Sequence, residues 1–118
     1  MSTAEFIEQI RTQPNEVAFQ QAMDTIRDEY DYTPTAFRNG VGDDVVDNVA
    51  GTNEGSCHIF AFAQLVGLSE AETLVCFGKH YRDVLNTPQG SDHANIRTFM
   101  RHGWKGIAFA GTALTLKK

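Results

Sequence analysis

Residues 53–65, Asn53-Glu54-Gly55-Ser56-Cys57-His58-Ile59-Phe60-Ala61-Phe62-Ala63-Gln64-Leu65, join a turn-forming cluster directly to the most apolar segment of the chain. The apolar segment runs for about a dozen residues, which is longer than a typical buried strand. Its apolar side chains recur at helical spacing on one face, and the opposite face is apolar as well. The pattern predicts a central buried helix over residues 56–66, capped by Ser56 and ended by a left-handed Gly67.

The length, the net charge and the longest apolar run of the sequence limit the class of protein and the partners that can be expected. A chain of 118 residues predicts one domain, residues 1–118, able to bury a core. Ten Lys and Arg against fifteen Asp and Glu give a net charge of −5, which argues against nucleic acid or an anionic membrane as a main partner. The longest apolar run, residues 59–63, is far shorter than the roughly 18 residues that span a bilayer.

Targeting and redox signals point to a reducing compartment. The first residues carry Glu5 and Glu8 and no long apolar run, so no secretory signal peptide is expected. Cys57 and Cys76 form no CxxC pair, and we interpret them as reduced thiols in a cytosolic protein.

Two helices are predicted before the central segment. Ser2 and Glu5 have the capping-box spacing, and Pro14 ends the first helix. Asn15 is predicted to cap the second helix, whose inward face carries Phe19, Met23, Ile26 and Tyr30.

Residues 30–55 break this helical pattern. Asn39-Gly40 is a turn pair, and the acidic residues 42–47 fit either a short strand or an exposed loop. So long an irregular segment is usually functional or mobile, or it contains a small hairpin. The sequence leaves these alternatives open.

After the central segment, a second capping box at Ser69 predicts a helix that continues through Gly78 to Leu85. Gly78 lowers the stability of such a helix but allows another element to approach closely.

A last helix follows a turn at residues 86–90. Ser91 or Asp92 is predicted to cap it, and Gly103 to end it, with Ile96, Phe99 and Met100 facing inward. Short strands are expected at residues 107–109 and 113–116. The whole pattern predicts an α+β fold, mainly helical, with a small β element.

Two segments combine loop residues with a helix start, where free N–H groups and a partial positive charge attract anions. The first is the loop at residues 53–57, and the second begins at Asp92. His93, Arg97 and Arg101 share one helical face and fit either a solvated basic surface or a clamp for carboxylate or phosphate. Simple capping also explains each segment on its own. The predicted ligand-binding residues are Asn53, Glu54, Gly55, Ser56, Asp92, His93 and Arg97.

Catalytic chemistry has weaker support in the sequence. Cys57 in a first helical turn is a candidate nucleophile with a lowered pKa, although a cysteine there is more often a packing residue. His58 and His93 are further candidates, and His80 is another possible base. The histidines show no HxxxH or HExxH spacing, so no metal and no cofactor is expected.

Several stretches together resemble one known family, the HopJ type III effector proteins. They are residues 32–40, 50–63, 76–78, 92–97 and 103–107. The resemblance covers nearly the whole chain, and it transfers no catalytic residue, because none is established for the family.

The resemblance implies secretion from a bacterial cytoplasm into a host cell, where a host protein would be the partner. The two helix starts point instead to a small anionic ligand. Glu5 and Glu8 depart from the Ser-rich, acid-poor start that such secretion signals commonly have. We therefore expect an effector-like interaction or ligand-binding protein. The alternatives are a small cytosolic enzyme that uses Cys57 or a His/Arg pocket, and a bacterial housekeeping protein that is not secreted.

Overall fold

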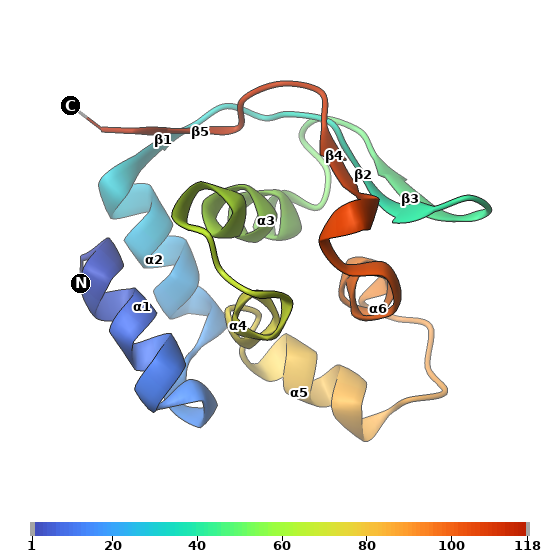
Figure 1. Ribbon diagram of the computed structural model, residues 1–118, viewed down its shortest axis with the longest axis horizontal. Coiled ribbons are helices and arrows are strands. Elements are labelled where there is room, and N and C mark those ends of the chain that lie inside the picture. The colour runs from blue at the N-terminus through green and yellow to red at the C-terminus, as the bar shows by residue number, and fades with distance from the viewer. Residues whose placement is uncertain (1, 118) are drawn as a thin grey trace.

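The computed structural model describes residues 2–117 and has the expected α+β fold, mainly helical with two small sheets (Figure 1). The first half contains α1 (Thr3–Thr12), the 3-10 turn η1 (Pro14–Glu16), α2 (Phe19–Glu29), β1 (Tyr30–Tyr32), β2 (Phe37–Val41) and β3 (Asp44–Asn48). The second half contains α3 (Glu54–Val66), α4 (Glu70–Val75), α5 (Lys79–Asn86), α6 (Ala94–His102), the 3-10 turn η2 (Gly103–Gly106), β4 (Ile107–Phe109) and β5 (Leu114–Leu116).

Both sheets pair the middle of the chain with its C-terminal end. β1 pairs antiparallel with β5, and β2 is the central strand of the order β3-β2-β4. Phe37 of β2 stands opposite Phe109 of β4, and their rings stack 5.1 Å apart. The strands expected near residues 107–109 and 113–116 are therefore confirmed. Within the described residues, no helix has the length and apolarity that crossing a membrane requires.

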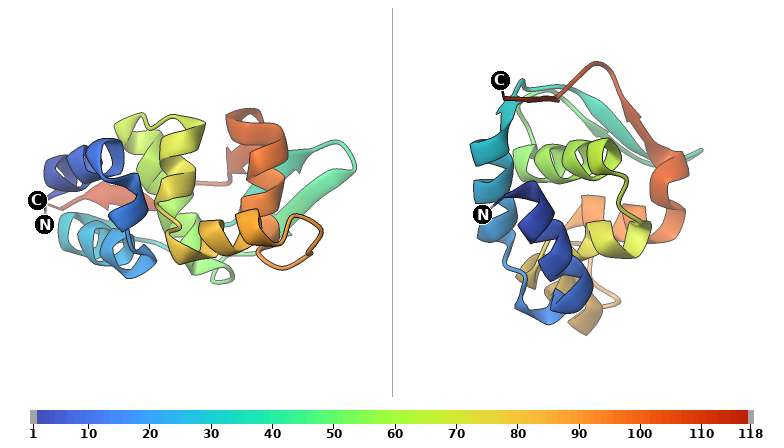
Figure 2. Two further views of the ribbon diagram at one scale, coloured as in Figure 1. Left: turned by 90° about the horizontal axis from the view of Figure 1, so that it is seen from below. Right: turned by 60° about the vertical axis from the view of Figure 1, so that its left-hand side comes forward.

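α3 is the central helix, as its apolar pattern predicts. Residues 57–63 are all buried, and α2, α4 and β5 contact the helix from different sides (Figures 1 and 2). Gly67 ends it in the left-handed conformation, as expected. The start was predicted wrongly: Asn53, not Ser56, is the N-cap residue. The last turn also reaches the surface, where Leu65 is 56% exposed.

Phe60 of α3 lies at the centre of the aromatic core. Its ring contacts those of Phe37, Phe77, Phe99 and Trp104 at centroid distances between 4.9 and 6.4 Å. These rings come from β2, from the turn after α4, from α6 and from η2, so one side chain joins four parts of the chain.

The capping boxes at Ser2 and Ser69 are both present, because each hydroxyl accepts the predicted backbone N–H three residues on. The capping role predicted for Asn15 is wrong. Asn15 lies inside η1, and α2 begins only after Ala18.

The helix predicted from Ser69 to Leu85 is two helices. α4 ends at Val75, and α5 starts after Gly78, which has φ of +57°. A Cβ on Gly78 would lie 2.6 Å from the backbone nitrogen of Phe19, so the close approach expected there exists, and it redirects the chain.

Residues 37–48 form the hairpin that was one of the alternatives. Its turn is at Gly42-Asp43, so the turn predicted at Asn39-Gly40 is wrong. Asn39 and Gly40 pair within β2 instead, opposite Val46 and Val45.

α6 turns Ile96 and Phe99 into the core and ends at Gly103, as predicted. Met100 is 42% exposed, so its predicted inward position is wrong. The N-cap residue is His93 rather than Ser91 or Asp92.

Candidate functional site

A cavity of about 370 Å³ lies where the N-termini of α3 and α6 meet. The start of α2, the junction between α4 and α5, and β3 complete its wall. The lining residues are Phe19, Val46, Asn53, Gly55, Ser56, Phe77, His80, His93, Ala94, Asn95 and Ile96. Its size is within the range of small-molecule sites, and most of its wall is apolar or aromatic.

Both helix N-termini at this cavity lack a side-chain cap within residues 2–117. The first backbone bonds run from Cys57 N–H to the Asn53 oxygen and from Arg97 N–H to the His93 oxygen. The amides before them, at residues 54–56 and 94–96, find no backbone acceptor in their own helix. Two positive helix ends therefore open on one cavity, which is lined by residues 55, 56 and 94–96 from their first turns.

Asn53 and His93 share an unusual backbone conformation. They are the two non-glycine residues with positive φ in the described part of the chain, at +49° and +53°. Such values are uncommon outside glycine and cluster at functional positions. Here each one directs the chain into the first turn of a helix that opens on the cavity.

A network of asparagines, three of them buried and Asn53 at its exposed end, connects the two helix starts. Asn53 Nδ2 and Asn95 Nδ2 both donate to Asn48 Oδ1, at 2.7 and 2.9 Å. Asn48 Nδ2 returns a bond to Asn95 Oδ1, and Asn39 Nδ2 donates to the Asn95 carbonyl oxygen. Because the hairpin supplies Asn39 and Asn48, the hairpin sets the relative position of α3 and α6. The Oδ1 atom of Asn39 is buried without a partner in the described residues.

Three rings follow one another along the wall of the cavity. The Phe19 ring meets the His80 ring edge-on at 4.7 Å, and the His80 and His93 rings lie 5.1 Å apart. Burial lowers the pKa of His80, and the neighbouring His93 lowers it further. No Lys, Arg, Asp or Glu is among the described residues that line the cavity.

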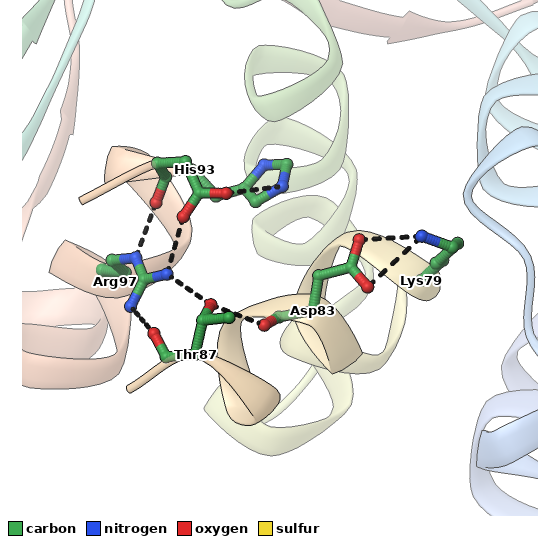
Figure 3. A network of polar contacts seen from close by, with 6 residues as sticks. Lys79, Asp83, Thr87, His93 and Arg97 are labelled. Atoms are coloured by element: carbon green, nitrogen blue, oxygen red, sulfur yellow. Dashed lines mark hydrogen bonds and ion pairs between the residues drawn. The ribbon is translucent and has the colours of Figure 1, made fainter. Parts of the chain in front are cut away.

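Arg97 does not line this cavity, and its side chain is bonded to other parts of the protein. The side chain is buried, and its guanidinium already donates to Thr87 and Asp92 (Figure 3). Nε and Nη1 reach the backbone oxygens of Asp92 and Thr87, and Nη2 reaches Thr87 Oγ1 and Asp92 Oδ1, at 2.6 to 3.0 Å. Arg97 therefore holds the loop between α5 and α6.

Asp92 is the other end of this clamp and is not a lining residue. Its carboxylate lies on the surface, and its ion pair with Arg97 lowers its pKa. The His93 Nε2 atom lies 3.8 Å from Asp92 Oδ2.

Cys57 and His58 point away from the cavity into the fold. The Cys57 thiol is 1% exposed and donates to the Thr35 oxygen. Burial raises its pKa, which is opposite to the direction that a nucleophile needs. His58 donates from Nδ1 to the Glu54 oxygen at 2.6 Å, and its ring stacks on Tyr32 at 3.8 Å.

Glu54 is exposed and also lies outside the lining set. Burial raises the pKa of the Tyr32 phenol, and the nearby Glu54 carboxylate raises it further.

The predicted site residues fall into two groups in the structure. Asn53, Gly55, Ser56 and His93 line the cavity, whereas Glu54, Cys57, His58, Asp92 and Arg97 do not.

The prediction missed several lining residues. The sequence predicts His80 only as a possible base, and it predicts a core position or no role for Phe19, Val46, Phe77 and Asn95. These residues lie in α2, in β3, in the turn after α4, in α5 and in α6, so no single local pattern relates all of them. No group of three His, Cys, Asp or Glu side chains in residues 2–117 is arranged to hold a metal ion.

The family model described as HopJ type III effector protein matches residues 3–114. The chain belongs to the HopJ family. Among curated proteins no match was found.

A solved structure shares the HopJ fold of this chain. It is described as the crystal structure of an unknown function protein, VPA0580, and is 46% identical. The match has a TM-score of 0.93 and covers 99% of this chain and 95% of that one.

Proposed function

We propose that this HopJ protein binds a small organic molecule that carries one anionic group, a carboxylate or a phosphate, in the cavity between α3 and α6. The convergence of two uncapped helix N-termini on one apolar cavity carries this proposal. The free amides would bind the anionic group, while Phe19, Val46 and Phe77 would contact an apolar body.

The volume of the cavity and the positive ends of α3 and α6 support a ligand that binds weakly. A volume of about 370 Å³ accommodates a molecule larger than an inorganic ion. Helix ends each contribute about 0.3–1 kcal/mol to an interaction with an anion, so the two ends together supply at most about 2 kcal/mol and an anion alone should bind only at tens of millimolar or above.

The family name supports a finer proposal about where the protein acts. We infer that it is an effector-like binding protein that a bacterium delivers into a host cell, where the ligand or a host protein is its partner. The alternative of a Cys57 enzyme has less support, because that thiol is buried with a raised pKa.

Titration with acetate and benzoate, followed by amide NMR spectra, tests ligand binding. Both ions carry the same carboxylate, but benzoate adds a ring for the apolar wall. We expect the largest shifts at the amides of Gly55, Ser56 and Asn95, and an affinity about tenfold higher for benzoate, since burying its ring adds about 1–2 kcal/mol.

Ala94→Leu is the blocking variant, because Ala94 is exposed and lines the cavity. Ala71→Leu on α4 is the matched control, since Ala71 is an exposed helical alanine that does not line the cavity. Ala94→Leu should weaken benzoate binding, and Ala71→Leu should not. Shifts that are scattered over the surface, or that Ala94→Leu leaves unchanged, would refute the site.

A further inference from the structure

The strongest additional feature of the cavity is the pair of imidazoles in its wall. We propose that His80 and His93 couple anion binding to proton uptake, so that the site binds its ligand more tightly as the pH falls. This inference rests on the proposed function and adds its regulation.

The two rings are the only titratable side chains among the described lining residues. Their centroids are 5.1 Å apart, so two positive imidazolium rings would repel each other at short range. In the free cavity this repulsion opposes the presence of a proton charge on both rings at once. An anion beside the rings offsets this repulsion and favours a further proton.

The charged groups around the pair are already matched with each other. On α5, Lys79 Nζ pairs with Asp83 Oδ2 at 3.0 Å. In the loop before α6, Asp92 pairs with Arg97 at 2.7 Å while lying 3.8 Å from His93 (Figure 3).

The other elements around the pair contribute uncharged lining residues: Phe19 from α2, Val46 from β3, and Gly55 and Ser56 from α3. A ligand in the cavity thus meets the charge of the imidazoles and of the helix ends with little competition.

The protonation behaviour of His80 fits this arrangement. Burial and the neighbouring His93 lower the pKa of His80 from the ordinary 6.5, although Asp83 acts in the opposite direction, so the ligand-free site disfavours the protonated ring. A bound anion acts in the opposite direction and raises that pKa. By linkage, the factor by which the anion favours the proton equals the factor by which the proton favours the anion.

The test uses sulfate, whose charge stays constant between pH 5.5 and pH 8. We expect the sulfate affinity to rise by up to about tenfold per pH unit as pH falls below neutrality, the limit for one proton taken up per anion. Calorimetry in two buffers of different ionisation enthalpy measures the proton uptake directly. Benzoate binding at fixed pH serves as the separate test of the cavity.

His80→Gln and His93→Gln should each flatten the pH dependence. His102→Gln is the matched control, because His102 lies outside the lining set and bonds Asp44 at 2.7 Å. The melting temperature of each variant shows whether it folds. If a variant does not fold, the pH dependence of sulfate affinity in the unaltered protein tests the proposal.

The outcomes separate the two proposals. Proton coupling is supported if the sulfate affinity rises as pH falls, if this pH dependence is flattened in His80→Gln and His93→Gln, and if it is retained in His102→Gln. Sulfate or benzoate binding of constant affinity, still blocked by Ala94→Leu, overturns proton coupling and leaves the ligand site intact. No binding of either ion at any pH overturns both.

Discussion

At the scale of single residues, Phe60 shows how an apolar sequence becomes a specific core. It is fully buried, and its ring contacts four other aromatic rings from separate elements. Leu65 on the same helix is 56% exposed, although sequence pattern alone makes both look like core residues.

Phe60→Ala should lower the free energy of unfolding by about 3–5 kcal/mol, because a large aromatic cavity remains among rings that cannot all collapse into it. Leu65→Ala is the control on the same helix and should change the free energy of unfolding by less than about 0.5 kcal/mol. Urea unfolding followed by circular dichroism measures both. Similar losses in the two variants would contradict this picture of α3.

Arg97 is a residue whose role only its partners reveal. Its position at a helix start matches that of an anion-binding arginine, yet its donors are already bonded to Thr87 and Asp92. Burying a guanidinium requires such partners, so the side chain serves the loop rather than a ligand.

At the scale of elements, Gly78 separates α4 from α5 and brings the chain against the start of α2. Glycine is required at position 78 for two independent reasons. Its φ is positive, and a Cβ there would lie too close to the backbone of Phe19. Because Phe19 lines the cavity, this contact also shapes the candidate site.

Gly67→Ala serves as the reference, since Gly67 has positive φ in the αL region, where the backbone cost is smaller than at the ψ of −126° of Gly78, and has open space around it. That variant should lose about 1–2 kcal/mol of unfolding free energy from backbone strain alone. Gly78→Ala should lose more, because its Cβ also meets the backbone of Phe19. Denaturant unfolding compares the two, and equal losses would show that the close contact is without energetic consequence.

The hairpin of β2 and β3 has a positioning role as an element. Its asparagines at 39 and 48 bond the residues that start α6 and α3, and Val46 enters the cavity wall. The bonds of this polar network favour one arrangement of the hairpin and the two helices, although Asn39 Oδ1 has no partner in the described residues.

At the scale of the whole molecule, the fold depends on packing without a covalent cross-link in residues 2–117. Cys57 and Cys76 are both free and buried. Burial raises the pKa of Cys76 to about 12, so its thiol stays protonated under ordinary conditions.

Dithiothreitol should therefore change the melting temperature by less than about 2 °C, because a disulfide, if present, would contribute several kcal/mol. Both thiols should react slowly with a thiol reagent at neutral pH and quickly in urea. Fast labelling of the folded protein, or a fall of about 10 °C on reduction, would contradict the placement of these cysteines.

The sequence alone determined the features that depend on residues within about one helical turn of each other. The capping boxes at Ser2 and Ser69 need only a side chain and an amide three residues apart, and the burial of residues 57–63 follows from their composition. Resemblance of several stretches to one family was likewise sufficient to assign the family.

Only the tertiary structure decided which residues share the cavity. His80 and His93 lie in different elements, and their rings meet because Gly78 redirects α5 and because Arg97 holds the loop before α6. Three other candidates lie outside the cavity wall, because each is hydrogen-bonded to another group of the protein: Cys57, His58 and Arg97. Local spacing cannot specify such partners, because the free energy that selects them comes from contacts between segments distant in the chain.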